Sequence, residues 1–111
     1  MKRMLVILLN LLMTLSATAG TVDHVRITML NINKDIPNVL FVQTEGTKTG
    51  GNPACHINST WTFVLPLVDK NDQQILALLL AARASQGLVR IDGNGQCNVF
   101  GSIETATYVT Y

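Results

Sequence analysis

The sequence lacks an excess of charge of either sign. Eight lysines and arginines stand against seven aspartates and glutamates in 111 residues, and the basic residues are scattered along the chain. A nucleic-acid-binding domain needs a basic patch that neutralises phosphates, and a protein that binds anionic lipid needs a polybasic run. Because neither pattern is present, we expect no nucleic-acid partner.

Side chains that hold metals or carry out nucleophilic chemistry are also few. The two histidines and two cysteines are too few and too dispersed for a closed zinc site, and no nucleophile elbow or phosphate-binding loop is present. We therefore predict a protein that is not an enzyme, with no metal, no cofactor and no catalytic residues. The alternative is a small hydrolase in which Glu45 and Glu104 act as paired carboxylates across the fold.

The longest apolar run is too short to cross a membrane. Residues 5–15 are almost wholly apolar, follow Lys2 and Arg3, and are followed by Ala17 and Ala19 at the positions that a signal peptidase reads. A membrane-spanning helix needs about 20 apolar residues, whereas this layout is typical of a secretory signal peptide. We predict a bacterial signal peptide over residues 1–19, a single secreted or periplasmic domain over residues 20–111, and no membrane span in that domain. An uncleaved membrane anchor is the alternative.

Both cysteines lie in the predicted exported domain. Cys55 and Cys97 are expected to pair because the compartment is oxidising. Closing a loop of about 43 residues would stabilise the fold by roughly 4 kcal/mol in the chain-entropy model. The alternative is a pair of free thiols, with His56 beside Cys55 as a base.

Residues that fall on opposite faces at alternate positions in segments 21–32, 59–68 and 99–111, together with the short segments 39–45 and 88–92, predict five strands. The expected strands cover residues 21–32, 39–45, 59–68, 88–92 and 99–111. The glycine-rich residues 46–53 predict a flexible loop between the second and third strands. In the third strand, Trp61, Phe63, Leu65 and Leu67 share one face, which we assign to the core.

Residues 71–86 change to helical spacing. Asn71 is the expected N-cap, with Gln74 three residues on as in a capping box, and Gly87 is the expected C-cap. Leucines cover most of the circumference of this helix, which is wider than the apolar stripe of an ordinary surface helix. The helix is therefore either deeply buried or in contact with another subunit.

The order of elements is three strands, a helix and two strands. This order predicts a mainly β protein, a five-stranded OB-fold-like barrel with one α-helix between strands 3 and 4, a fold whose face and loops bind oligosaccharides or oligonucleotides. An open five-stranded sheet covered by one helix is the alternative. Closure into a barrel is favoured because it removes sheet edges that would otherwise aggregate.

The remaining polar and aromatic residues indicate binding rather than catalysis. Asp23 and Glu45 are candidate polar contacts to a ligand, and Tyr108 offers an aromatic face on which a sugar ring can stack. We predict these three residues as the ligand-binding site. A protein-interaction or accessory domain with no glycan ligand is the alternative.

Several short segments resemble a known family. Residues 41–46 (FVQTEG), residues 84–91 (ASQGLVRI) and residues 93–97 (GNGQC) followed by Glu104 and Thr105 are similar to segments of the B subunit of subtilase cytotoxin and of related pertussis-like B subunits. Glu45 falls at a position similar to a glycan-contact residue of that family, and Asp23 lies near another. The placement of the cysteines differs from that of the toxin subunits.

The resemblance implies both a fold and a set of partners. Members of that family are OB-folds that assemble as a ring of five, bind sialylated glycans on host cells and carry a separate catalytic A subunit. On this resemblance we expect a host glycan as ligand, a homo-pentamer and a catalytic partner.

Overall fold

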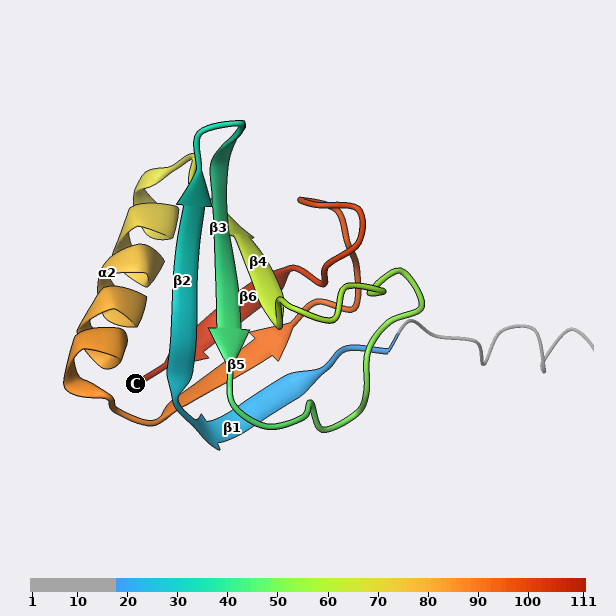
Figure 1. Ribbon diagram of the computed structural model, residues 1–111, viewed down its shortest axis with the longest axis horizontal. Coiled ribbons are helices and arrows are strands. Elements are labelled where there is room, and N and C mark those ends of the chain that lie inside the picture. The colour runs from blue at the N-terminus through green and yellow to red at the C-terminus, as the bar shows by residue number, and fades with distance from the viewer. Residues whose placement is uncertain (1–17) are drawn as a thin grey trace, which may run out of the picture.

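The computed structural model describes residues 18–111, and Figure 1 shows their arrangement. Residues 1–17 of the predicted signal peptide lie outside the described residues. Among the described residues, no helix combines the length and the hydropathy that crossing a membrane requires.

The protein is mainly β, with two small antiparallel sheets and one helix (Figure 1). The first sheet has the strand order β1-β5-β6, with β1 over Thr21–Val25, β5 over Val89–Gly93 and β6 over Ala106–Thr110. The second sheet has the order β2-β3-β4, with β2 over Ile27–Asn33, β3 over Ile36–Thr44 and β4 over Phe63–Pro66. In the described part of the chain, the two sheets are not closed into a barrel.

The chain passes from one sheet to the other at Arg26, the single residue between β1 and β2. The prediction of one continuous strand over residues 21–32 is therefore wrong. His24 has a positive φ of 53°, and the register of β1 against β5 shifts between Val22 and Val25. This irregularity changes the direction of the chain, so that β2 pairs with β3 and does not continue beside β5.

The other predicted strands are present with different bounds. The third predicted strand, over residues 59–68, is reduced to β4 because residues 58–61 form a turn. In this turn, Oδ1 of Asn58 accepts hydrogen bonds from the backbone N–H groups of Thr60 and Trp61, each at 2.9 Å. The last strand begins at Ala106 because an isolated bridge between Phe100 and Ile103 folds the preceding residues back on themselves. One parallel bridge, between Val64 and Thr105, joins the second sheet to the chain just before β6.

Both faces of β4 are buried, in two separate apolar clusters. Phe63 and Leu65 belong to the main core with Leu79 of the helix, as the sequence predicted. Trp61 is only half-buried and packs against the second cluster, with its ring centroid 5.5 Å from that of Phe41. Its assignment to the face of Phe63 is wrong, because the turn at Asn58 takes Trp61 out of the alternation of the strand.

Helix α2 covers Lys70–Ser85 and contacts β2 and β6 (Figure 1). Its N-cap is Asp69, whose carboxylate accepts from the N–H of Asp72 at 2.9 Å while Asp72 accepts from the N–H of Asp69 at 3.1 Å. The predicted capping box of Asn71 and Gln74 is wrong by two residues, because the helix begins earlier and the aspartates satisfy the free N–H groups of Asp69 and Asp72. The C-cap is Gln86, in the left-handed conformation, and not Gly87.

The helix is not deeply buried, although its sequence is apolar. Leu79 and Ala82 are its buried residues, and Leu80 is 52% exposed. Of the two explanations for its wide apolar surface, deep burial is therefore wrong. Contact with another subunit stays a prediction.

The predicted disulfide is present between Cys55 and Cys97. It joins the long connection between β3 and β4 to the connection between β5 and β6, and α2 lies within the loop that it closes. Because neither cysteine is free, the alternative of a thiolate beside His56 is wrong.

Candidate functional site

The connection between β3 and β4, residues 45–62, forms one wall of the candidate site. Thr49 is held against Thr21 by two backbone hydrogen bonds of 3.0 and 2.7 Å, and Asn58 donates its N–H to the carbonyl of Ser102 at 3.2 Å. With the disulfide at Cys55, these contacts attach the loop to the rest of the protein at several points along its length. Residues 46–53 form a loop, as predicted, and its contacts define its path; the predicted flexibility stays a prediction.

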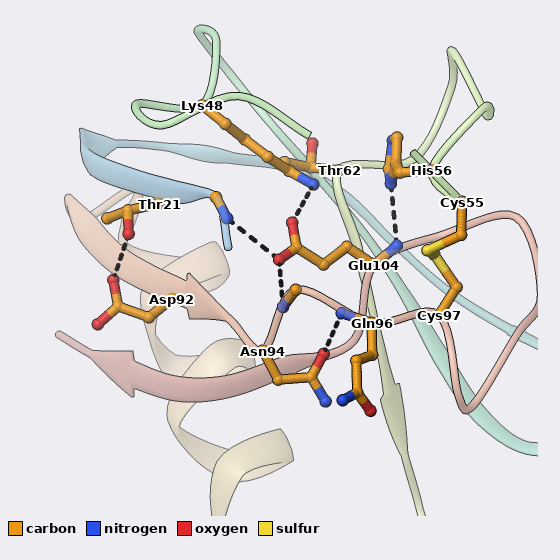
Figure 2. A network of polar contacts seen from close by, with 12 residues as sticks. Thr21, Lys48, Cys55, His56, Thr62, Asp92, Asn94, Gln96, Cys97 and Glu104 are labelled. Atoms are coloured by element: carbon orange, nitrogen blue, oxygen red, sulfur yellow. Dashed lines mark hydrogen bonds and ion pairs between the residues drawn. A yellow bond between two sulfur atoms is a disulfide. The ribbon is translucent and has the colours of Figure 1, made fainter. Parts of the chain in front are cut away.

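A buried carboxylate lies beneath this loop. The side chain of Glu104 has no exposed surface, and Figure 2 shows it at the centre of a polar network. Its Oε1 accepts from Nζ of Lys48 at 3.0 Å, and its Oε2 accepts from the backbone N–H groups of Gly95 at 2.8 Å and Gly20 at 3.1 Å. Glu104 therefore ties together the loop, the turn after β5 and the residue before β1.

Lys48 descends from the loop to reach this carboxylate (Figure 2). Its side chain is 5% exposed, and Nζ lies 4.2 Å from the centre of the Phe63 ring. Burial lowers the pKa of Lys48, and the hydrogen bond and charge of Glu104 act in the opposite direction. The ion pair and the ring together compensate a charge that burial disfavours.

His56 contacts the same network through the backbone. Its Nδ1 accepts the N–H of Glu104 at 2.9 Å, so Nδ1 carries no proton and Nε2 is the ring donor. Burial lowers the pKa of His56, and the positive charge of Lys48 lowers it further. Both effects favour the neutral form of the imidazole.

A polar pocket of about 670 Å³ lies between the loop and the ends of β2 and β3. Hydroxyl and amide side chains make up much of its lining, including Thr28, Gln43, Thr47 and Asn52, and Trp61 contributes an aromatic wall. Gln43 is held in place because it accepts from the hydroxyl of Thr28 at 2.8 Å and donates to the carbonyl of Thr60 at 3.0 Å.

The charged groups of the pocket are already satisfied. Lys48 and His56 are the titratable residues among those lining it in the described chain, and Lys48 is paired with Glu104. The pocket therefore presents hydrogen-bonding groups that are preorganised and carry no unpaired charge.

The structure does not bring together the three ligand-binding residues predicted from the sequence. Asp23 is exposed on β1 and lines a shallow hollow with Arg90, and Glu45 lies 3.8 Å from a guanidinium nitrogen of Arg26 beside the end of α2. Tyr108 is exposed on β6, opposite Asp92 of β5. None of the three lines the polar pocket.

Glu45 and Glu104 have different partners, Arg26 for the first and Lys48 for the second. They do not form the paired carboxylates of the hydrolase alternative. Among residues 18–111, no three histidine, cysteine, aspartate or glutamate side chains gather as metal ligands.

Three residues of the site were not predicted from the sequence: Lys48, Gln43 and Trp61. For Lys48, the sequence offered one signal: it is the single lysine of the glycine-rich segment 46–53, which carries no large apolar residue. Glu104 gave a weaker signal, because an acidic residue within an alternating segment is most simply explained as a solvated strand position.

No protein-family model, curated protein or solved structure matches the chain. The resemblance to toxin B subunits therefore stays a prediction. Function is therefore inferred from the chemistry of the site itself.

Proposed function

We propose that the protein is an exported carbohydrate-binding module, and that the polar pocket between β2, β3 and the residue 45–62 loop holds a neutral saccharide. The observation that carries this proposal is the lining of the pocket. Hydroxyls and amides occur there with one tryptophan and without an unpaired charge.

This lining suits the chemistry of a sugar. A sugar ring has an apolar face that stacks on an aromatic side chain, and hydroxyls at its edge that pair with amides and hydroxyls. Trp61 would supply the stacking surface, while Gln43 and Thr28 would supply hydrogen bonds. A volume of about 670 Å³ lies within the usual range for small-molecule sites.

The charge of the pocket favours a neutral sugar over a sialylated one. A sialic acid carries a carboxylate, which is best recognised by an unpaired arginine or lysine. Lys48 already pairs with Glu104 at 3.0 Å, and the lowered pKa of His56 favours its neutral form. The proposed ligand class therefore differs from the one that the family resemblance implies.

The fold supports a binding role of the OB type. β1 and β2 are consecutive and belong to different sheets, and the Val64–Thr105 bridge brings β4 beside the chain that leads into β6. These two features are what a small Greek-key barrel with a strand shared by both sheets would require. We propose that the two sheets are the halves of such a barrel.

The test is binding of the exported, purified protein to an array of neutral and sialylated glycans, followed by calorimetry with the best ligand. Replacing the stacking surface, Trp61→Ala, should weaken binding by about tenfold. Tyr108→Ala is the matched control, because it removes an exposed aromatic ring that does not line the pocket. Circular dichroism melts of both variants check that each is folded.

The outcomes separate the parts of the proposal. If no glycan binds, carbohydrate recognition is refuted, and binding restricted to sialylated glycans refutes the neutral-ligand assignment. A loss of binding in Tyr108→Ala with none in Trp61→Ala refutes the pocket and favours the site predicted from the sequence.

A protein-contact role is the second candidate, supported by the exposure of Leu80 on α2. It includes assembly into a toxin-like ring with a catalytic partner. Light scattering distinguishes these possibilities, because a stable monomer would contradict the ring.

A further inference from the structure

Gly20 is the point at which the chain enters the fold. Ala19 is exposed, whereas Gly20 is buried, with its N–H 3.1 Å from Oε2 of Glu104 and its carbonyl accepting from the N–H of Gly93 at 2.8 Å. A Cβ on this residue would lie 2.5 Å from the carbonyl oxygen of Gly51, so no larger residue fits without movement of the loop.

The nitrogen of Gly20 is also the atom that the predicted processing step would release. Hydrolysis of the Ala19–Gly20 bond adds one water across it. The carbonyl carbon of Ala19 keeps the added oxygen as a carboxylate, and the nitrogen of Gly20 becomes an amine, which takes up a proton at neutral pH. The new ammonium group is therefore created at an atom that already points at a buried carboxylate.

We propose that Glu104 is the internal binding site for the α-amino group of the processed chain. Cleavage would convert the existing N–H···O contact to Glu104 into a charge-assisted one, which is about twice as strong as a neutral hydrogen bond. Each carboxylate oxygen of Glu104 would contact a different cation. Oε1 accepts from Nζ of Lys48, and Oε2 accepts from the nitrogen of Gly20. Removal of the leader thereby completes the network that holds the 45–62 loop.

This inference depends on cleavage after Ala19 and not on glycan binding, so either proposal can fail alone. Six charged or titratable groups face this end of the chain: Glu104 and its partner Lys48, His56 at the backbone of Glu104, Asp92 through Thr21, and Asp23 and Arg90 in the hollow that Ala19 lines. All six are retained in the comparison that follows, so their own titration contributes equally to both proteins.

The experiment compares two full chains that are exported and processed in the same host. One is the wild type, and the other carries a single serine inserted between Ala19 and Gly20. Mass spectrometry of each product establishes where it begins. In the insertion variant, Gly20 keeps its N–H, but the ammonium group is displaced by one residue, about 3.8 Å along the chain.

We expect the wild type to melt about 4–8 °C higher than the insertion variant at about pH 6. An α-amine titrates at about pH 7.7–8.0 in an unfolded chain, and the contribution of its paired ammonium form is lost as the pH rises beyond its folded-state pKa. The difference in melting temperature should therefore disappear by about pH 10.5. It should also be absent when both chains carry Glu104→Gln.

A second measurement needs no substitution of Glu104. The amine of the processed wild type should react about tenfold more slowly than that of the insertion variant with an amine-selective acylating reagent, because burial and pairing protect it. A product that begins at a residue other than Gly20 overturns the proposal, as does equal reactivity. A melting difference that persists at high pH also overturns it, because that result would report packing of the serine and not a charge.

Discussion

Replacing Glu104 with glutamine tests whether the buried ion pair organises the candidate site. Glu104→Gln keeps the size of the side chain but removes the charge that faces Lys48 Nζ at 3.0 Å. Lys48 would remain 5% exposed over the ring of Phe63 with no counter-ion. Removing one partner of a buried pair costs about 3–5 kcal/mol, because the other charge is left uncompensated.

That cost is large for a domain of this size. Small domains are stable by about 5–15 kcal/mol, and each 1 kcal/mol lowers the melting temperature by about 4–8 °C. We therefore expect Glu104→Gln to melt at least about 12 °C below the wild type. Urea denaturation followed by circular dichroism measures the free energy of unfolding, and the melting temperature provides a second reading.

Glu45→Gln is the matched control. The Glu45–Arg26 pair is about half exposed at both ends, with 3.8 Å between the charged atoms, so it should contribute less than about 1 kcal/mol. The double variant Lys48→Met/Glu104→Gln should recover part of the stability lost in Glu104→Gln, because the unpaired cation is gone. If Glu104→Gln loses no more stability than Glu45→Gln, or if the double variant recovers nothing, the reasoning is refuted.

Two further predictions concern the same region. Reduction of the Cys55–Cys97 bond, which spans 42 residues, should lower the free energy of unfolding by about 4 kcal/mol in the chain-entropy model; an unchanged melting temperature in reductant would contradict this. His56 has a pKa lowered first by burial and then by Lys48. Around and below its ordinary value of 6.5 the unfolded chain therefore binds a proton that the folded chain resists, and stability decreases as the pH is lowered. His56→Gln keeps an acceptor for the N–H of Glu104 and should reduce the stability lost between about pH 7.5 and 5; an equal loss in His56→Gln and in the wild type would refute the assignment.

The sequence was most informative where an element is local. The spacing of Ile75, Leu76 and Leu79 predicts α2, and the alternation of residues 88–92 predicts β5 within one residue of its bounds. Such patterns arise because the period of a helix or strand decides which side chains face the core. The pairing of the two cysteines was also predictable, because an oxidising compartment leaves two thiols a single intramolecular choice.

The misplaced helix cap shows where local reasoning becomes ambiguous. Asp69, Asn71 and Asp72 are all suitable capping residues within four positions. The structure selects Asp69 because the reciprocal bonds with Asp72 satisfy two backbone N–H groups at once. Sequence patterns place the end of a helix near such a cluster without selecting the residue.

The sequence by itself determined the strand and helix periods and the disulfide partners, because each depends on neighbouring residues or on composition. Only the tertiary structure decided that Glu104 is buried and paired with Lys48, 56 residues away. It also decided that Gln43 and Trp61 line one pocket while Asp23, Glu45 and Tyr108 lie apart. Those relationships depend on how the chain crosses between sheets at Arg26 and on how the 45–62 loop folds over Glu104. A local pattern of apolar residues does not predict contacts between residues so far apart in the chain.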